Sequence, residues 1–341
     1  MKKNTQNLLK TALVTGLLFC LPISNLLASS EGSGDFNPGE TIIHHISDAN
    51  EIHLFSAGDF HATIPLPVIL YKSGQGLTLA MSSSFHHGHE IDGYGLHHGK
   101  IHRADHASFL DFSITKNVFM MLICAGLLLW MFLGAAKKYR EKEKAPSGMQ
   151  NLLEVLILFV RDEVARPILG DKAGKYMPYL LTLFFFIWVC NMIGLIPGFG
   201  ANITGNIAVT LTLAAFTFVI TLFSSNKHFW GHIFAPPGVP PWLLPIMIPV
   251  EVIGIFTKPV ALLIRLFANM TAGHMIILSI VCLIFIFGKT SAVAGYGVAV
   301  VSVAFTLFMM MLELLVAALQ AYIFTILSAL YFSEASAGGE H

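Results

Sequence analysis

Ionisable and polar side chains recur at regular spacing inside a part of the sequence that is otherwise almost entirely apolar. Glu251, Lys258 and Arg265 are seven residues apart, so they would lie along one stripe of an α-helix. Asn269 follows four residues later on the same side, whereas His274 would point roughly to the opposite side. Because a charged group at membrane depth is costly, these residues require a functional or structural reason to be there.

A second apolar segment carries a matching set of polar residues. Glu313 and Gln320 are again seven residues apart, and Ser302 and Thr306 lie upstream on faces that can approach the same stripe. Pairing that only holds helices together would explain a single ion pair more easily than aligned groups on two helices. Ionisable residues inside membranes commonly mark ion or proton pathways, and His and Glu can relay protons near neutral pH. The pattern therefore favours a transport pathway.

The composition is that of a membrane protein. Of the 341 residues, 55% are hydrophobic and 12% are charged, whereas soluble domains usually have about 25% charged residues. The formal net charge is zero, which gives no indication of nucleic-acid binding. Cys20, Cys124, Cys190 and Cys282 lie in apolar runs without a pairing or ligand pattern, so we expect them to act as small hydrophobic residues.

Residues 1–28 have the layout of a secretory signal peptide, with a basic start, an apolar core and small residues near Ala28. The alternatives are a retained anchor or a lipoprotein signal at Cys20, and the bulky Phe19 argues against the lipoprotein. Cleavage near Ala28 would leave the mature N-terminus outside the cytoplasm. Residues 29–115 would then form an extracytoplasmic segment.

The segment 29–115 is rich in histidine and contains alternating stretches that predict a few short strands. His98, His102 and His106 would share one face of a helix and could in principle ligate a metal. No acidic residue or cysteine completes a ligand set at a recognisable spacing. We therefore predict a solvated, partly ordered segment and no metal site.

Residues 116–341 form the predicted membrane domain. Asn117–Ala136 has 20 residues, enough to cross the hydrocarbon core of about 30 Å, and the basic run after it predicts a cytoplasmic end. Asn151–Leu169 is amphipathic and is expected to lie along the cytoplasmic interface. Tyr176–Gly198 would span outward and Asn206–Phe223 would span back. A proline cluster in the loop 224–242 prevents a continuous helix there.

Two apolar tracts follow, Leu244–Phe287 and Ala292–Phe332. Each has about forty residues, roughly twice the length that a perpendicular helix needs, so each must be tilted, broken or partly in the membrane plane. Counting spans places the C-terminus in the cytoplasm. The predicted fold is an all-α membrane protein with about five membrane helices, the last two long and strongly tilted. An interfacial amphipathic helix and a small extracytoplasmic N-terminal segment complete it.

Two stretches, "KPVALLIRLFANMTAGHMI" and "ELLVAALQAYIFTILSALYF", resemble the a subunit of the membrane (Fo) sector of bacterial F-type ATP synthases. "NMIGLIPG" in an earlier span is also similar to that family. The resemblance extends from Asn117 to the C-terminus, and the signal peptide and the histidine-rich segment lie outside it.

The resemblance implies a proton-translocating stator subunit in the bacterial inner membrane, with two half-channels that face a ring of c subunits. Arg265 corresponds to the family's essential arginine, and Asn269 and Gln320 to polar partners near it. Glu251 and Lys258 match the acid and base earlier on the same helix. His274 and Glu313 match a pair that some members carry the other way round.

The implied partners are the c ring, the b-subunit peripheral stalk, the remainder of the synthase and the lipid bilayer, with no cofactor and no nucleic acid. No glycine-rich phosphate loop occurs, so nucleotide chemistry would belong to partner chains and the chain itself would not be an enzyme. A secondary transporter would usually show an internal repeat, and a flagellar-type stator should carry a large cytoplasmic domain. A membrane scaffold is the remaining alternative, and the coupling ion, H⁺ or Na⁺, stays open.

Overall fold

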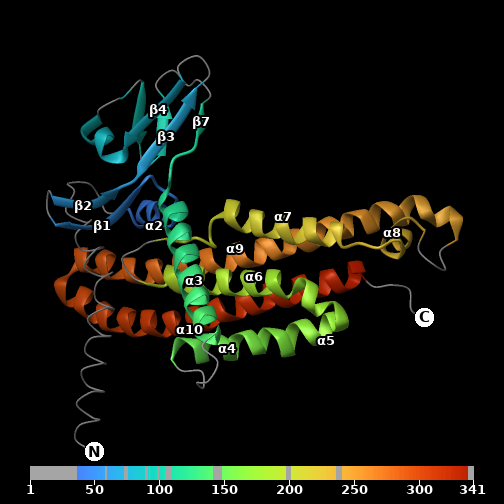
Figure 1. Ribbon diagram of the computed structural model, residues 1–341. Coiled ribbons are helices and arrows are strands. Elements are labelled where there is room, and N and C mark those ends of the chain that lie inside the picture. The colour runs from blue at the N-terminus through green and yellow to red at the C-terminus, as the bar shows by residue number, and fades with distance from the viewer. Residues whose placement is uncertain are drawn as a thin grey trace, which may run out of the picture. The chain divides into compact units, whose positions relative to one another are not determined.

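Figure 1 shows the computed structural model. The chain divides into two compact units, and each unit contains part of both long helices. Unit 1 comprises Met1–Leu122, Met192–Ile203 and Thr271–Leu314, and unit 2 comprises Ile123–Asn191, Thr204–Met270 and Leu315–His341. The predicted signal peptide lies outside the described residues. The structure describes residues 37–57, 60–72, 76–88, 91, 93–97, 100–103, 109–140, 148–196, 201–235 and 240–336.

Within these described residues, four helical segments are long and apolar enough to cross a membrane: Lys116–Tyr139, Met149–Gly194, Pro241–Thr290 and Ala292–Ser336. The number rises to five if α7 (Ile207–Phe223) and α8 (Lys227–Phe234), which meet at a bend of 100°, count as one broken span. The prediction of an all-α membrane protein with about five membrane helices is confirmed.

The predicted amphipathic segment 151–169 is helical in the structure. It consists of α4 (Met149–Phe159), a π-helical stretch (Val160–Ala165) and α5 (Arg166–Leu169), and a single 3₁₀ turn joins it to α6 (Ala173–Gly194). Its position at the membrane surface stays a prediction. Helix α8 was not predicted; it ends at Phe234, two residues before the first proline of the cluster.

The core of unit 2 forms where α6 packs against the parts of the two long helices that belong to this unit, residues 244–270 and 315–336. Leu262, Leu266 and Met270 are each 1% exposed and recur every four residues, so they form one face of α9 (Leu244–Thr290). The facing part of α10 (Ala292–Ser336) buries small residues such as Ala321 and Ala329, which allow helices to approach closely. This packing fixes how α9 and α10 are rotated about their own axes in unit 2, and so it decides which of their side chains lie on the outer faces.

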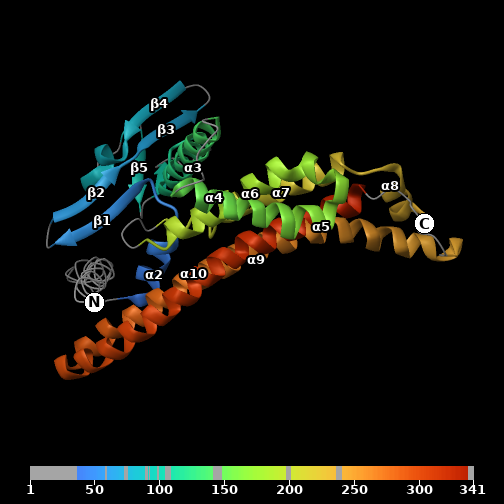
Figure 2. The ribbon, with the colours of Figure 1, turned by 60° about the horizontal axis from the view of Figure 1, so that its bottom comes forward.

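Helices α9 and α10 lie side by side and run in opposite directions, joined at Ser291 (Figures 1 and 2). Pro249 and Pro259 lie inside α9, which nevertheless continues for 47 residues. The sequence allowed the tract Leu244–Phe287 to be tilted, broken or partly in the membrane plane. The continuous helix excludes the broken arrangement. At the turn, a Cβ atom on Gly295 would be 2.8 Å from Cα of Gly288, so the two helices meet closely there.

The N-terminal part of unit 1 begins with α2 (Pro38–Ile46) and contains short antiparallel strands, which confirms the predicted strands. They form three sheets, with the orders β1-β2, β4-β3-β7 and β5-β6. Val68 and Leu70 of β3 pack with Phe85, Tyr94 and Ile101 in a small core. The strands are β1 (Glu51–Ala57), β2 (Phe60–Pro65), β3 (Pro67–Lys72), β4 (Gly76–Met81), β5 (Tyr94–His97), β6 (Lys100–Arg103) and β7 (Leu110–Asp111).

His98, His102 and His106 have a spacing that would suit one face of a helix, but the middle residue of the three is not on a helix. His102 belongs to strand β6, and His98 and His106 lie outside the described residues. Among the described residues, no group of three or more His, Cys, Asp or Glu side chains could hold a metal ion.

Candidate functional site

His274 of α9 and Glu313 of α10 form a hydrogen-bonded pair inside unit 1. The distance from Nδ1 of His274 to Oε1 of Glu313 is 2.7 Å, and the side chains are 15% and 4% exposed. Oε2 of Glu313 is buried and has no hydrogen-bond partner in the described part of the chain. The carboxyl group therefore has one oxygen on the imidazole and a second, buried oxygen with the capacity to accept a further hydrogen bond.

Glycines allow this pair to form. A Cβ atom on Gly273 would be 2.7 Å from Oε1 of Glu313, so only glycine lets the carboxyl group approach α9 so closely. On Gly194, near the end of α6, a Cβ atom would be 3.9 Å from Nε2 of His274 and 3.1 Å from the carbonyl oxygen of Ala201. Within unit 1, the end of α6 and the Glu313 region of α10 thus both lie close to the imidazole that α9 carries.

The polar stripe of α10 continues from Glu313 toward the turn that joins the long helices. Thr306 lies seven residues before Glu313, and its hydroxyl is buried without a hydrogen-bond partner among the described residues. Ser302, one turn further, is 4% exposed. Buried hydroxyl groups on one helix face can hold water or exchange protons.

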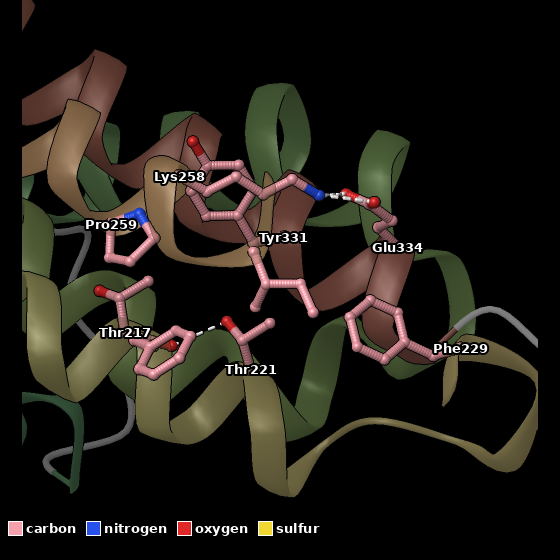
Figure 3. Close-up of a pocket in the computed structure, with 9 residues that line it drawn as sticks. Thr217, Thr221, Phe229, Lys258, Pro259, Tyr331 and Glu334 are labelled. Atoms are coloured by element: carbon pink, nitrogen blue, oxygen red, sulfur yellow. Dashed lines mark hydrogen bonds and ion pairs between the residues drawn. The ribbon is translucent and has the colours of Figure 1, made fainter. Parts of the chain in front are cut away.

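Lys258 forms an ion pair with Glu334 of α10 inside unit 2. Its Nζ atom lies 2.6 Å from Oε1 and 2.5 Å from Oε2, and 5.7 Å from the centre of the Tyr331 ring. Figure 3 shows the lysine side chain directed at Glu334 beside a cavity of about 20 Å³, which Thr217 and Thr221 also line. Such a volume is enough for one water molecule.

Sequence reasoning missed Glu334, although the signal was present. Glu334 lies 14 residues after Gln320 and 21 after Glu313, so it continues the same seven-residue spacing along α10. The prediction had assigned it to the polar C-terminal tail, whereas α10 runs to Ser336.

Asn191 is a second polar residue that the predicted site did not include. It is 1% exposed, and its Nδ2 donates to the carbonyl oxygen of Ala317 at 3.2 Å. Its Oδ1 accepts a hydrogen bond of 2.6 Å from the hydroxyl of Thr204. Asn191 begins the motif "NMIGLIPG", so the signal was again in the sequence. It anchors α6 to the backbone of α10, close to Gln320.

Arg265 and Asn269 lie on an exposed face of α9, and the side chain of neither makes a hydrogen bond or an ion pair in the part of the chain that the structure describes. Gln320 is 5% exposed, and Glu251 is half-buried. Of the seven predicted residues, the structure pairs His274 with Glu313. It gives Lys258 a partner that was not predicted.

These features define a multi-pass membrane protein in which two adjacent long helices carry paired ionisable groups, one pair largely buried and the other largely exposed. Residues 118–333 match the family described as ATP synthase A chain. The chain therefore belongs to this family and is a subunit of the Fo sector of an F-type ATP synthase. Residues 41–118 match a separate domain of unknown function (DUF8433).

Curated relatives agree with the family match. The chain is 49% identical over 268 residues to ATP synthase subunit a of Chloroherpeton thalassium, which covers 76% of this chain and 78% of the relative. It is 41% identical over 318 residues to ATP synthase subunit a of Chlorobium phaeobacteroides, covering 91% and 79%. The subunit a of Myxococcus xanthus is 46% identical over 242 residues, covering 68% and 76%.

Proposed function

We propose that the chain conducts protons through two half-channels and that Arg265 faces the carboxyl groups of a rotating c-subunit ring. The observation that carries this proposal is the position of Arg265 on α9. Its guanidinium lies on an exposed face of a predominantly apolar helix, between Lys258 and His274 in the chain. Each of these two neighbours is paired with an acidic residue of α10.

An exposed guanidinium within a membrane-spanning helix needs a partner from outside the chain. Arginine stays charged under all ordinary conditions, and its planar group suits a carboxylate. A ring of c subunits would bring one carboxyl group after another to Arg265. The fixed charge attracts each carboxylate, favours release of its proton, and blocks direct passage of protons from one half-channel to the other.

The pair His274–Glu313 supplies the half-channel on the extracytoplasmic side. Its buried, hydrogen-bonded imidazole and carboxyl group suit proton transfer, and Thr306 and Ser302 extend the polar stripe along α10. This pair also favours H⁺ over Na⁺ as the coupling ion, because a metal cation prefers several oxygen ligands. Gln320 and Asn269 would complete the polar surroundings of Arg265.

The pair Lys258–Glu334 and the adjacent cavity supply the cytoplasmic half-channel, with Glu251 further toward the start of α9. This assignment rests on the orientation expected from the basic run that follows the first span. The N-terminus would be extracytoplasmic and the C-terminus cytoplasmic, in a bacterial inner membrane. Besides the c ring, the expected partner is the b-subunit peripheral stalk.

The test is replacement of Arg265 by alanine in the assembled complex, with ATP-driven proton pumping measured by fluorescence quenching in inverted vesicles. We expect Arg265→Ala to abolish pumping and to permit passive proton leak through the Fo sector. Ile264→Ala, at the neighbouring exposed apolar position, is the matched control and should pump normally. An assembled Arg265→Ala complex that pumps at the control rate would refute the proposal.

A further inference from the structure

Helix α2 lies outside the residues that match the family described as ATP synthase A chain. That match begins at residue 118, whereas α2 covers Pro38–Ile46. The helix begins at Asn37, whose side chain accepts a hydrogen bond from the backbone N–H of Glu40, and Pro38 occupies the first position. The local sequence thus specifies a short helix with a fixed start, and the comparisons assign no role to it.

Helix α2 packs directly on α9 within unit 1. Ile42 contacts the buried cluster of Leu278, Val281 and Cys282, and Figure 2 shows α2 beside the hairpin of α9 and α10. Leu278 lies one helical turn after His274. The next residue of α2, Ile43, is 61% exposed, so only one face of the short helix makes this contact.

The other end of α2 is fastened to the first membrane helix, α3 (Lys116–Arg140). The carboxylate of Asp48 accepts hydrogen bonds from the hydroxyl of Thr115 at 2.8 Å and from the backbone N–H of Asn117 at 3.2 Å. Nζ of Lys116, which is 7% exposed, donates to the carbonyl oxygen of His45 at 3.1 Å. A carboxylate at a helix N-terminus is favourable, and these bonds leave α2 little freedom to move.

We propose that α2 is a fixed brace for the part of α9 that belongs to unit 1, residues 271–290. It holds this part of the helix in the position where His274 meets Glu313. This inference rests on the proposed function, since it assigns a positioning role for the same proton path. A hydrogen bond of 2.7 Å is lost when its partners separate by about 1 Å. Ile42 sets the position of α9 one turn from His274, and Asp48 sets the position of α2 relative to α3. Through this contact α2 positions the proton-transfer pair and does not itself transfer protons.

The packing can be tested with a native cysteine. Ile42→Cys introduces a thiol on α2 that faces the cluster containing Cys282, and copper phenanthroline would oxidise the two thiols to a disulfide. We expect the linked peptides in tryptic digests of the assembled complex. Ile43→Cys is the matched control and should not cross-link. The packing is refuted only if all three cross-links fail. The first is between Ile42→Cys and Cys282. The other two are made in a Cys282→Ala background, between Ile42→Cys and either Leu278→Cys or Val281→Cys.

The positioning role needs functional measurements on the assembled complex. Ile42→Asp places a carboxylate in the apolar contact and should lower ATP-driven proton pumping at least tenfold, whereas Ile43→Asp should leave it unchanged. If Ile42 acts through the pair, Ile42→Asp should add no further loss in a Glu313→Gln background. Normal pumping by Ile42→Asp, or an independent loss in the double variant, would overturn the inference.

Cross-linking also separates a brace from a moving lid. The oxidised Ile42→Cys complex should keep its pumping rate, because a brace does not need to move. Inhibition that is reversed by a reducing agent would show that α2 must move, and would overturn the inference. Pumping retained by Arg265→Ala would instead refute the proposed function, and the cross-linking results would stand independently of it.

Discussion

The carboxyl group of Glu313 lies against the backbone of Gly273, where a Cβ atom would be 2.7 Å from Oε1 and 3.1 Å from Cδ. These two residues are 40 positions apart in the chain, on the two long helices. The contact explains how a buried acidic side chain reaches the imidazole of His274 without displacing α9. It also identifies position 273 as one where a single added methyl group would push His274 and Glu313 apart.

Gly273→Ala should therefore impair proton transfer without removing any ionisable group. The added methyl group forces Glu313 or α9 to shift, and such overpacking costs about 1–3 kcal/mol. We expect lower ATP-driven pumping by an assembled complex, and a larger loss for Gly273→Val. Gly297→Ala is the control, because its Cβ atom would meet nothing within 4 Å. Equal pumping by the two alanine variants would argue against the close contact.

His274 and Glu313 should behave as a coupled pair. Either single replacement by alanine should lower the proton flux at least tenfold, since a positioned proton-transfer group contributes about 10²–10⁴-fold to rate. The exchange His274→Glu with Glu313→His should recover part of the flux, because it retains an acid–imidazole couple. Flux through the exchanged variant that is no higher than through the single variants would show that the two residues act separately.

The sequence predicted the membrane helices well because their signal is local. Long apolar runs and a seven-residue spacing of polar residues depend only on helix geometry, so Arg265, His274 and Glu313 were placed correctly on α9 and α10. The pairing of His274 with Glu313 followed from the family resemblance, and the structure brings the two side chains together.

Contacts between distant residues were not predictable. The seven-residue spacing includes Glu334, but it does not identify Lys258, 76 positions earlier, as its partner. The contact of Ile42 with α9 joins a domain of weak local signal to a membrane helix more than 200 residues later. The tilt of the long helices and the interfacial position of α4 and α5 stay predictions, because both are defined relative to the plane of the membrane.

The pair Lys258–Glu334 should matter more for proton flux than for stability. The two side chains are 35% and 55% exposed, and an exposed ion pair contributes about 1 kcal/mol or less. Glu334→Gln should leave assembly intact and slow ATP-driven pumping, since the carboxyl group beside the cavity is lost. Lys227→Gln, an exposed lysine on α8, is the control for the loss of a charged group. A Glu334→Gln complex that pumps like this control would exclude the pair from the path.

The mature protein should begin near residue 29, with residues 30–115 on the extracytoplasmic side. N-terminal sequencing of the purified complex measures the first point, and protease digestion from each side of sealed vesicles measures the second. An intact Met1 would exclude cleavage. Digestion of the segment from the cytoplasmic side would reverse the orientation proposed for both half-channels.

Arg265→Lys should assemble normally and yet lose ATP-driven proton pumping and ATP synthesis. The variant keeps a basic residue, so an argument from charge alone predicts mild damage. Severe damage is expected because a desolvated ammonium group can lose its proton, whereas a guanidinium keeps it and offers a planar pair of donors to a carboxylate. Unlike Arg265→Ala, the lysine variant should leak few protons, since a long side chain still fills the space between the half-channels. Quenching assays in inverted vesicles, with a blot for subunit assembly, distinguish these outcomes. Near-normal pumping by an assembled Arg265→Lys complex would show that position 265 requires only a positive charge.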